Sequence, residues 1–274
     1  MQYRTARHPR LTAALSALAA AALGAVLVAQ PASAQTAVNY VALGDSYSSG
    51  VGAGSYTSAS GSCDRSTNAY SQLWDNANHP ASYVSVACSG ATTSTVISSQ
   101  LSALSPATTL VSITVGGNDV GFTSTLETCI LDSTSSCVSA VDTGESEIAT
   151  QLPGELDSVL GDISADAPNA RVVVLDYPQF YDLSQSSGCI GLSTTDRTDL
   201  DQAAVELDSA LQAAAARHGD VFADVQSDFA GHEICDSSPW LHSLNFLDID
   251  ESYHPTAAGQ ADAYFPAFSA AAGG

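Results

Sequence analysis

Five short apolar runs, separated by longer stretches of helical character, constrain the fold of this chain more than any other feature of its sequence. Each run has four to seven residues, and the five cover 40–43, 83–87, 109–115, 172–175 and 221–225. Continuous apolar runs are typical of strands that are buried on both faces. Strands that alternate with helices form a mainly parallel sheet with helices on both sides. The sequence therefore predicts an α/β fold, a three-layer α/β/α sandwich.

The helical stretches between these runs differ in clarity. The clearest helix is predicted over 196–218, where Leu200, Leu207 and Leu211 recur at helical spacing. A second helix is predicted over 145–166. A last helix is predicted to start at Pro255, because proline is tolerated in the first helical turn. Loops are expected at 48–62, 89–99 and 119–142.

The first 34 residues have the pattern of a signal peptide. Three arginines within the first ten residues precede an apolar run at 11–28, and residues 32–34 supply a small-x-small cleavage pattern. A membrane anchor is the alternative, but the run is rich in alanine and is followed closely by the cleavage pattern. We therefore expect residues 1–34 to be a signal peptide, and residues 35–274 to form a single secreted domain, monomeric and without stable membrane insertion.

The charge of this domain limits its partners. All basic residues are arginines, and residues 35–274 contain four arginines against 29 acidic residues, a formal net charge of −25. Such a surface repels phosphate backbones, so nucleic acid is not an expected partner. The same charge slows approach to anionic lipid, but it does not exclude zwitterionic or neutral lipid.

The six cysteines all follow the predicted signal peptide. An even number of cysteines in an exported chain favours disulfides. Six cysteines allow fifteen pairings, and sequential pairing is the simplest because each bond then closes a local loop. A metal site is not expected, since the chain has no C-x-x-C pair. Sequential pairing would join Cys63 with Cys88, Cys129 with Cys137, and Cys189 with Cys235.

Small and polar residues follow the first three predicted strands. Ser46 follows the first strand, Gly90 the second, and the sequence 116–119, Gly-Gly-Asn-Asp, the third. Because ligands bind at the carboxyl ends of parallel strands, these residues are candidates for one site. Taken alone, Ser46 is better explained as a helix cap, and His254 as a surface residue at a helix start. As a pair, they could serve as a nucleophile and its general base.

These segments occur in the order, and near the spacing, of the four sequence blocks of the GDSL, or SGNH, hydrolases. The chain resembles that family from Ser46 to His254, and most closely the secreted lipases, esterases and phospholipases A1 of actinomycetes, whose six cysteines also pair sequentially. The resemblance implies a flavodoxin-like sheet and an enzyme without metal or organic cofactor. It implies that Ser46 is the nucleophile and His254 the base, with an oxyanion hole made by the main-chain N–H groups of Ser46 and Gly90 and the side-chain amide of Asn118.

Two positions depart from the family pattern. Tyr47 replaces the leucine of the Gly-Asp-Ser-Leu block, a change that we expect to lie outside the chemistry. Glu251 stands where many relatives have an aspartate three residues before the histidine. In some actinomycete relatives a main-chain carbonyl orients the histidine instead, which here would be that of Ser252. The sequence leaves Glu251 and the Ser252 carbonyl as alternatives for the third member.

The expected function is therefore hydrolysis of carboxylic esters through an acyl-serine intermediate. The expected substrate is a lipid or another acyl ester. Phospholipids cleaved at the sn-1 position, as by a phospholipase A1, are among the candidates. A carbohydrate acetylesterase is one alternative. A non-catalytic extracellular domain of the same fold that binds glycans or surfaces is another, although it would have no need of Ser46, Gly90, Asn118 and His254 together.

Overall fold

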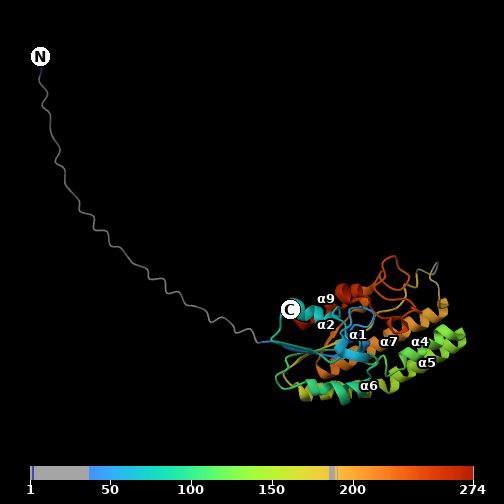
Figure 1. Cartoon of the computed structure of the whole chain (residues 1–274), viewed down its shortest axis with the longest axis horizontal. Coiled ribbons are helices and arrows are strands. Elements are labelled where there is room, and N and C mark those ends of the chain that lie inside the picture. The colour runs from blue at the N-terminus through green and yellow to red at the C-terminus, as the bar shows by residue number, and fades with distance from the viewer. Residues whose placement is uncertain (1, 3–36, 185–188, 190, 274) are drawn as a thin grey trace. The chain divides into compact units, whose positions relative to one another are not determined.

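A five-stranded parallel sheet forms the centre of the domain (Figure 1). The strand order is β2-β1-β3-β4-β5, which is the order of flavodoxin-like sheets. Both the α/β class and the flavodoxin-like sheet predicted from the sequence are thereby confirmed. The strands are β1 (Asn39–Gly44), β2 (Ser82–Ser85), β3 (Leu110–Thr114), β4 (Arg171–Leu175) and β5 (Val221–Ala223).

The computed structural model describes residue 2, residues 37–184, residue 189 and residues 191–273. The predicted signal peptide, residues 1–34, lies outside the described residues except for residue 2, so it stays a prediction. Residues 37–274 form one compact unit. No helix among the described residues is long and apolar enough to cross a membrane.

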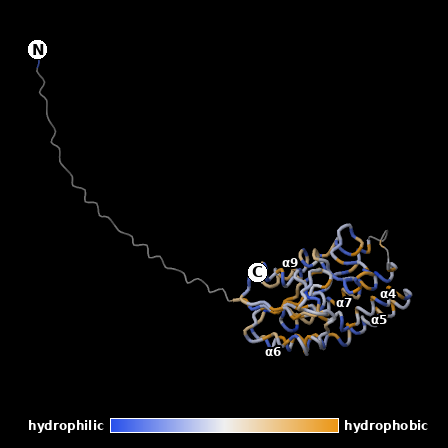
Figure 2. The backbone as a smooth tube through the Cα atoms, viewed as in Figure 1, coloured by the Kyte–Doolittle hydropathy of each residue, from blue (hydrophilic) through white to orange (hydrophobic). Residues whose placement is uncertain are grey.

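Burial along the strands follows their place in the sheet. The central strands β1, β3 and β4 are almost entirely buried, as their continuous apolar runs predict. In Figure 2 the apolar segments accordingly gather in the interior of the domain. Strand β2 lies at the sheet edge and is alternately exposed, so the prediction that its two faces are both buried is wrong.

Helices cover both faces of the sheet, with α2 and α9 on one side and α6 and α7 on the other (Figure 1). This arrangement gives the predicted three layers. The α-helices are α1 (Ser46–Ser49), α2 (Tyr70–Asn78), α3 (Thr93–Thr95), α4 (Phe122–Leu131), α5 (Thr134–Thr150), α6 (Leu152–Asp166), α7 (Thr194–His218), α8 (Ala257–Gly259) and α9 (Phe265–Ala272). The 3-10 and π-helical segments are η1 (Ser58–Cys63), η2 (Val96–Gln100), η3 (Leu101–Ala103), η4 (Gln226–Phe229), η5 (Ile249–Glu251) and η6 (Gln260–Tyr264).

Three helix predictions need correction. The helix predicted over 145–166 is divided into α5 and α6, because Pro153 lies in the first turn of α6, where its missing N–H is harmless. The loop predicted over 119–142 is mostly α4 and the start of α5. The last helix starts at α8 rather than at Pro255, because the Thr256 side chain accepts a hydrogen bond from the main-chain N–H of Gly259 and forms the N-cap.

The other two predicted loops also contain helical turns. The stretch 48–62 includes the end of α1 and most of η1, and the stretch 89–99 includes α3 and most of η2. The two stretches begin four residues after β1 and four residues after β2, at the edge of the sheet where the candidate site residues lie. The segments expected to be irregular are therefore more ordered than their serine-rich, threonine-rich and glycine-rich sequences indicated.

All six cysteines form disulfides, with no free cysteine among the described residues. The pairing is sequential, as the sequence analysis favoured. One bond joins α4 to α5, and another ties the segment after β2 to η1. The three bonds are Cys63–Cys88, Cys129–Cys137 and Cys189–Cys235.

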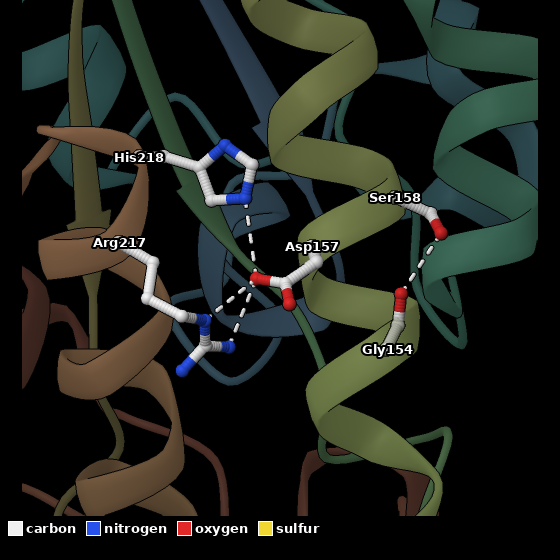
Figure 3. A network of polar contacts seen from close by, with 5 residues as sticks. All are labelled: Gly154, Asp157, Ser158, Arg217 and His218. Carbon is white, nitrogen blue, oxygen red and sulfur yellow. Dashed lines mark hydrogen bonds and ion pairs between the residues drawn. The ribbon is translucent and has the colours of Figure 1, made fainter.

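Helices α6 and α7 are joined by a polar contact at their surface (Figure 3). One oxygen of Asp157 lies 2.9 Å from Arg217 Nη2 and 3.2 Å from His218 Nε2. The hydrogen bond from Arg217 is the main reason that the pKa of this carboxyl lies below its usual value, and the one from His218 acts in the same direction. The side chains of Arg217 and Asp157 are 43% and 44% exposed, so solvent weakens the contact and it contributes little to stability.

Candidate active site

The first strand, β1, places Ser46 at the carboxyl end of the sheet. β1 ends at Gly44, and Ser46 is the first residue of α1, whose N-cap is Asp45. Gly44 has φ +120°, and a Cβ there would lie 2.4 Å from the Thr114 main-chain oxygen. Only glycine allows this close approach of β1 to the end of β3. The tight turn holds Ser46 next to the segment that follows β3.

His254 meets Ser46 from the other end of the chain. Nε2 of His254 lies 2.7 Å from Oγ of Ser46, and Nδ1 lies 3.1 Å from the main-chain oxygen of Ser252. A carbonyl can only accept, so Nδ1 carries the hydrogen and Nε2 is free to accept from the serine hydroxyl. Burial lowers the pKa of His254 to about 4, although the Ser252 carbonyl acts in the opposite direction. The imidazole is therefore neutral at pH 7.

Glu251 does not take part in this contact. Its Oε1 accepts a hydrogen bond from the hydroxyl of Tyr56, at 2.8 Å, and that hydroxyl also accepts from the N–H of Gly52. Of the two alternatives for the third member, the structure places the Ser252 carbonyl against the imidazole and turns Glu251 toward another loop.

The donors expected to surround an oxyanion lie on three segments, which follow the neighbouring strands β1, β2 and β3. Gly90 has φ +75°, where a side chain would be strained, and nothing lies within 4 Å of the position of its missing Cβ. Asn118 donates one amide hydrogen to the Ala91 carbonyl, at 3.0 Å, which leaves its second hydrogen for a ligand. Within the described part of the chain, the main-chain N–H groups of Ser46 and Gly90 donate to no protein acceptor. All three residues line one cavity.

Asp119 joins the segment that carries Gly90 to the one that carries Asn118. Its carboxylate accepts hydrogen bonds from the N–H of Thr93, at 3.0 Å, and from the Thr93 hydroxyl, at 2.6 Å. Burial raises the pKa of Asp119, and the bonds from Thr93 oppose that rise. Asn118 and Asp119 thus hold the chain just after Gly90, and the sequence analysis assigned Asp119 no separate role.

Two buried glutamines hold the main chain on either side of Ser46. Gln100 binds both the N–H and the carbonyl of Gly44, at 2.8 and 2.9 Å. Gln260 donates to the carbonyl of Tyr47, at 2.9 Å. Both side chains are almost completely buried. Sequence reasoning missed them, because nothing in the sequence around either glutamine marks it as buried.

Tyr47, which the sequence analysis placed outside the chemistry, contacts the segment that carries His254. Its hydroxyl donates to the main-chain carbonyl of Tyr253, at 2.7 Å, and its ring centroid lies 5.1 Å from that of His254. Tyr253 has φ +63°, a left-handed conformation that is uncommon for a bulky residue. The tyrosine hydroxyl, which leucine lacks, therefore supports the unusual turn just before the histidine.

Asp45 stabilises the turn between β1 and α1 that carries Ser46. One carboxylate oxygen accepts from the Thr114 hydroxyl, at 2.6 Å, and from the N–H of Tyr47, at 3.0 Å. The other accepts from the hydroxyl of Tyr177. Burial raises the pKa of Asp45 to about 6, while these hydrogen bonds favour its charged form. Asp45 faces the strand ends rather than His254, so it supports the turn around Ser46.

A cavity of about 570 Å³ extends from Ser46 and His254 toward α4, α5 and α7. Beyond the polar residues at Ser46, its walls are mostly aliphatic and aromatic. Its volume lies within the range of small-molecule sites. Representative apolar wall residues are Leu126, Ile130, Val141, Ile148, Phe180 and Leu207.

This arrangement can perform acyl transfer. A serine hydroxyl that donates to a neutral imidazole can be deprotonated as it attacks a carbonyl carbon. Free N–H donors beside it can stabilise the negative oxygen that develops. Among the described residues, no group of three or more His, Cys, Asp or Glu side chains is arranged to hold a metal ion.

The sequence profile of the GDSL-like lipase/acylhydrolase family matches residues 42–261. The chain belongs to this family. The matched residues span every segment that contributes to the site, from the strand before Ser46 to the helical turns after His254. Like other members, the chain is a carboxylic ester hydrolase.

Several Streptomyces proteins of the family are similar to this chain. "Lipase 1" of Streptomyces coelicolor is 53% identical over 269 residues, which cover 97% of this chain and 100% of the relative. The crystal structure of a phospholipase A1 from Streptomyces albidoflavus has a TM-score of 0.84 at 50% identity, and that of an extracellular lipase from Streptomyces rimosus has 0.84 at 47%. Each alignment covers 86% of this chain and 100% of the solved one.

Proposed function

We propose that this member of the family hydrolyses acyl esters of lipids through a covalent acyl-Ser46 intermediate. The observation that carries the proposal is the 2.7 Å contact between Ser46 Oγ and His254 Nε2 at one end of a largely apolar cavity. The contact supplies an activated nucleophile, and the cavity supplies a place for a hydrocarbon chain. Its volume of about 570 Å³ is larger than an acetyl group requires.

The reaction proceeds in two halves. Ser46 Oγ attacks the ester carbonyl carbon while its proton passes to His254 Nε2, and the negative oxygen is held by the Ser46 and Gly90 N–H groups and the Asn118 amide. The tetrahedral intermediate collapses, the C–O bond to the alcohol breaks, and the imidazolium returns the proton to the leaving alkoxide. Water then repeats the sequence on the acyl-enzyme, releasing the fatty acid and restoring the serine. The Ser252 carbonyl keeps Nδ1 protonated throughout.

Phospholipids and other lipid esters are the proposed substrates. Relatives at about 50% identity bear the names lipase and phospholipase A1, which supports acyl chains rather than acetylated sugars as the group bound in the cavity. We further propose that residues 1–34 direct secretion, as the name of the extracellular Streptomyces rimosus relative supports. The acidic surface makes nucleic acid an unsuitable partner, and we propose that the domain acts as a monomer.

A fluorophosphonate probe followed by a substrate panel tests this function. The probe should label one serine, and Ser46→Ala should abolish both labelling and hydrolysis. Ser49→Ala, at a buried serine of the same short helix, is the matched control and should still be labelled. A chain that is not labelled at all would be a non-catalytic binding domain.

The panel compares p-nitrophenyl esters of increasing chain length, phosphatidylcholine and acetylated xylan. We expect higher kcat/KM for medium and long acyl chains than for acetate, because only the longer chains fill the apolar cavity. A preference for acetylated xylan would replace the lipid proposal with the carbohydrate acetylesterase.

A further inference from the structure

The most exposed large apolar side chains of the described residues gather at the cavity. Leu247 is 99% exposed, Phe246 81%, Leu131 70% and Ile249 57%, and no other large hydrophobic side chain in the described ranges exceeds 46%. Three of the four, Leu131, Phe246 and Ile249, also line the cavity that contains Ser46 and His254. Concentrated exposure of this kind marks an interaction surface rather than chance.

Phe246 and Leu247 lie on a loop with a defined shape. The base of the loop is closed by main-chain hydrogen bonds between His242 and the pair Tyr253 and His254, at 3.0 Å each. Within the loop, the Asn245 side chain accepts from the N–H groups of Leu247 and Asp248, and the N–H of Asn245 donates to the Ser252 hydroxyl. These bonds give the main chain around Phe246 and Leu247 a defined shape although both side chains are highly exposed. We call residues 244–252 the apolar loop.

The apolar loop is continuous with the catalytic histidine. It ends two residues before His254, and the carbonyl of its last residue, Ser252, is the one that faces Nδ1. An acyl chain that leaves a lipid layer at Phe246 and Leu131 enters the cavity directly and reaches Ser46 along apolar walls. Continuity between the exposed patch and the cavity identifies the occupant as the same kind of molecule as the substrate.

Charge decides which lipid surface fits. Asp248, Asp250 and Glu251 flank the exposed apolar residues in the loop, and residues 35–274 carry a formal net charge of −25. An anionic bilayer would repel this face. A zwitterionic surface offers the same hydrocarbon without that repulsion.

We propose that the apolar loop, together with Leu131, docks the domain on a zwitterionic phospholipid surface, with Leu247 and Phe246 inserted among the acyl chains. This inference rests on the proposed lipid ester hydrolysis and adds the way in which the enzyme reaches an aggregated substrate. Leu247, which does not line the cavity, serves docking alone, whereas Phe246 belongs to both surfaces.

Co-sedimentation with phosphatidylcholine vesicles tests the proposal. The measurement uses a Ser46→Ala background, so that the vesicles are not consumed. We expect Leu247→Ser to lower the vesicle partition coefficient about tenfold, the value for losing one well-buried leucine, and Leu247→Ile to keep it within twofold. Val84→Ser, which removes an exposed apolar side chain on the edge strand β2, is the matched control and should not change partition. Equal partition of Leu247→Ser and the parent would overturn the proposal.

A fluorescence measurement gives an independent readout. A tryptophan introduced as Leu247→Trp should shift its emission to the blue on phosphatidylcholine vesicles and should be quenched by brominated acyl chains. Vesicles with increasing phosphatidylglycerol should bind less at low salt. No shift with phosphatidylcholine, or tighter binding to the anionic vesicles, would contradict the proposal.

The hydrolysis of soluble p-nitrophenyl butyrate separates this inference from the proposed function. With Ser46 intact, Leu247→Ser should keep this activity while it loses activity on vesicles. Loss of vesicle binding with retained soluble activity supports both statements. Retained soluble activity with unchanged vesicle binding overturns only the docking, and a Ser46→Ala protein that still cleaves the soluble ester overturns the function.

Discussion

The hydroxyl of Tyr47 is a single group on which the position of the histidine depends. It donates to the carbonyl of Tyr253 inside the protein, next to a left-handed main chain. The tyrosine is therefore a positioning residue, since it acts on the reaction only through His254. A leucine at this position would fill the space without making the hydrogen bond.

Tyr47→Phe removes this hydroxyl and leaves the ring in place. We expect the free energy of unfolding to fall by about 1–3 kcal/mol, the cost of leaving a buried carbonyl unpaired. We expect kcat to fall about tenfold with little change in KM, because the imidazole is less well held while the cavity is intact. Tyr181→Phe, which removes a hydroxyl that contacts the Tyr253 side chain rather than its carbonyl, is the control. Equal kcat for Tyr47→Phe and the parent would show that the hydroxyl is not needed.

Glu251→Gln tests which group orients His254. The glutamine can still accept from Tyr56, and the Ser252 carbonyl is untouched. We expect kcat/KM to stay within about threefold of the parent, far from the roughly 10⁴-fold loss on replacing a triad aspartate by asparagine.

The pH profile of activity gives a second readout of the same histidine. Since burial lowers the pKa of His254 to about 4, activity should fall only as the pH drops through about 4, where the imidazole gains a proton and can no longer act as base. A 100-fold loss, or a shift of this acid limb, would favour a role for the carboxylate.

At the scale of elements, the site depends on the ties between segments that follow different strands. Asp119, after β3, binds Thr93, after β2, and so sets the place of Gly90 relative to Asn118. Asp119→Ala removes these hydrogen bonds. We expect kcat to fall by one to two orders of magnitude, because a misplaced oxyanion donor loses most of its effect.

Thr93→Val is the matched control for this element. It removes one hydroxyl but keeps the main-chain N–H that also donates to Asp119. Its kcat should lie between those of the parent and Asp119→Ala. If Asp119→Ala loses thermal stability but no activity, the tie serves folding only.

The elements also differ in how well the sequence predicts them. The strands follow from continuous apolar runs and the long helix α7 from helical periodicity, and both are predicted within a few residues of their observed bounds. The division at Pro153 was missed although a proline in the first helical turn is a local signal, whereas helix α4 was missed because it depends on how its segment packs around the cavity. Ser46, Gly90, Asn118 and His254 were found because they occur in ordered sequence blocks. Gln100, Gln260 and Tyr47 were not, since their roles exist only between segments far apart in the sequence.

For the molecule as a whole, buried carboxyl groups govern how stability depends on pH. Burial raises the pKa of Asp45 to about 6 and that of Asp201 to about 7. Burial also holds the pKa values of Asp176 and Asp208 well above 3.8, and the charge of Asp224 adds to the rise at Asp176 as that of Asp176 does at Asp208. Above about pH 4 these carboxyl groups release their protons in the unfolded state but keep them in the folded state. Their contribution to the free energy of unfolding is therefore full below about pH 4 and is lost as the pH rises through their raised pKa values. His254, with its lowered pKa, acts in the opposite direction between about pH 6.5 and 4.

Asp208→Asn tests this account by replacing the neutral acid with an amide of the same shape. The asparagine can still accept from the N–H of Tyr177 and can pair with the amide of Gln226. We expect the free energy of unfolding of the parent to decrease from pH 5 to pH 8, and that of the variant to decrease less steeply. Denaturant titrations at four pH values measure both slopes. Parallel slopes would mean that Asp208 is already ionised in the folded protein.

The two groups that meet at 2.7 Å are 208 positions apart in the sequence. No contiguous fragment of the chain contains both unless it spans nearly the whole domain. Turnover is consequently an assay of global integrity: heat inactivation and cooperative melting should follow one curve, and a single proteolytic cut that releases residues 254–274 would leave the Ser46 hydroxyl without its base.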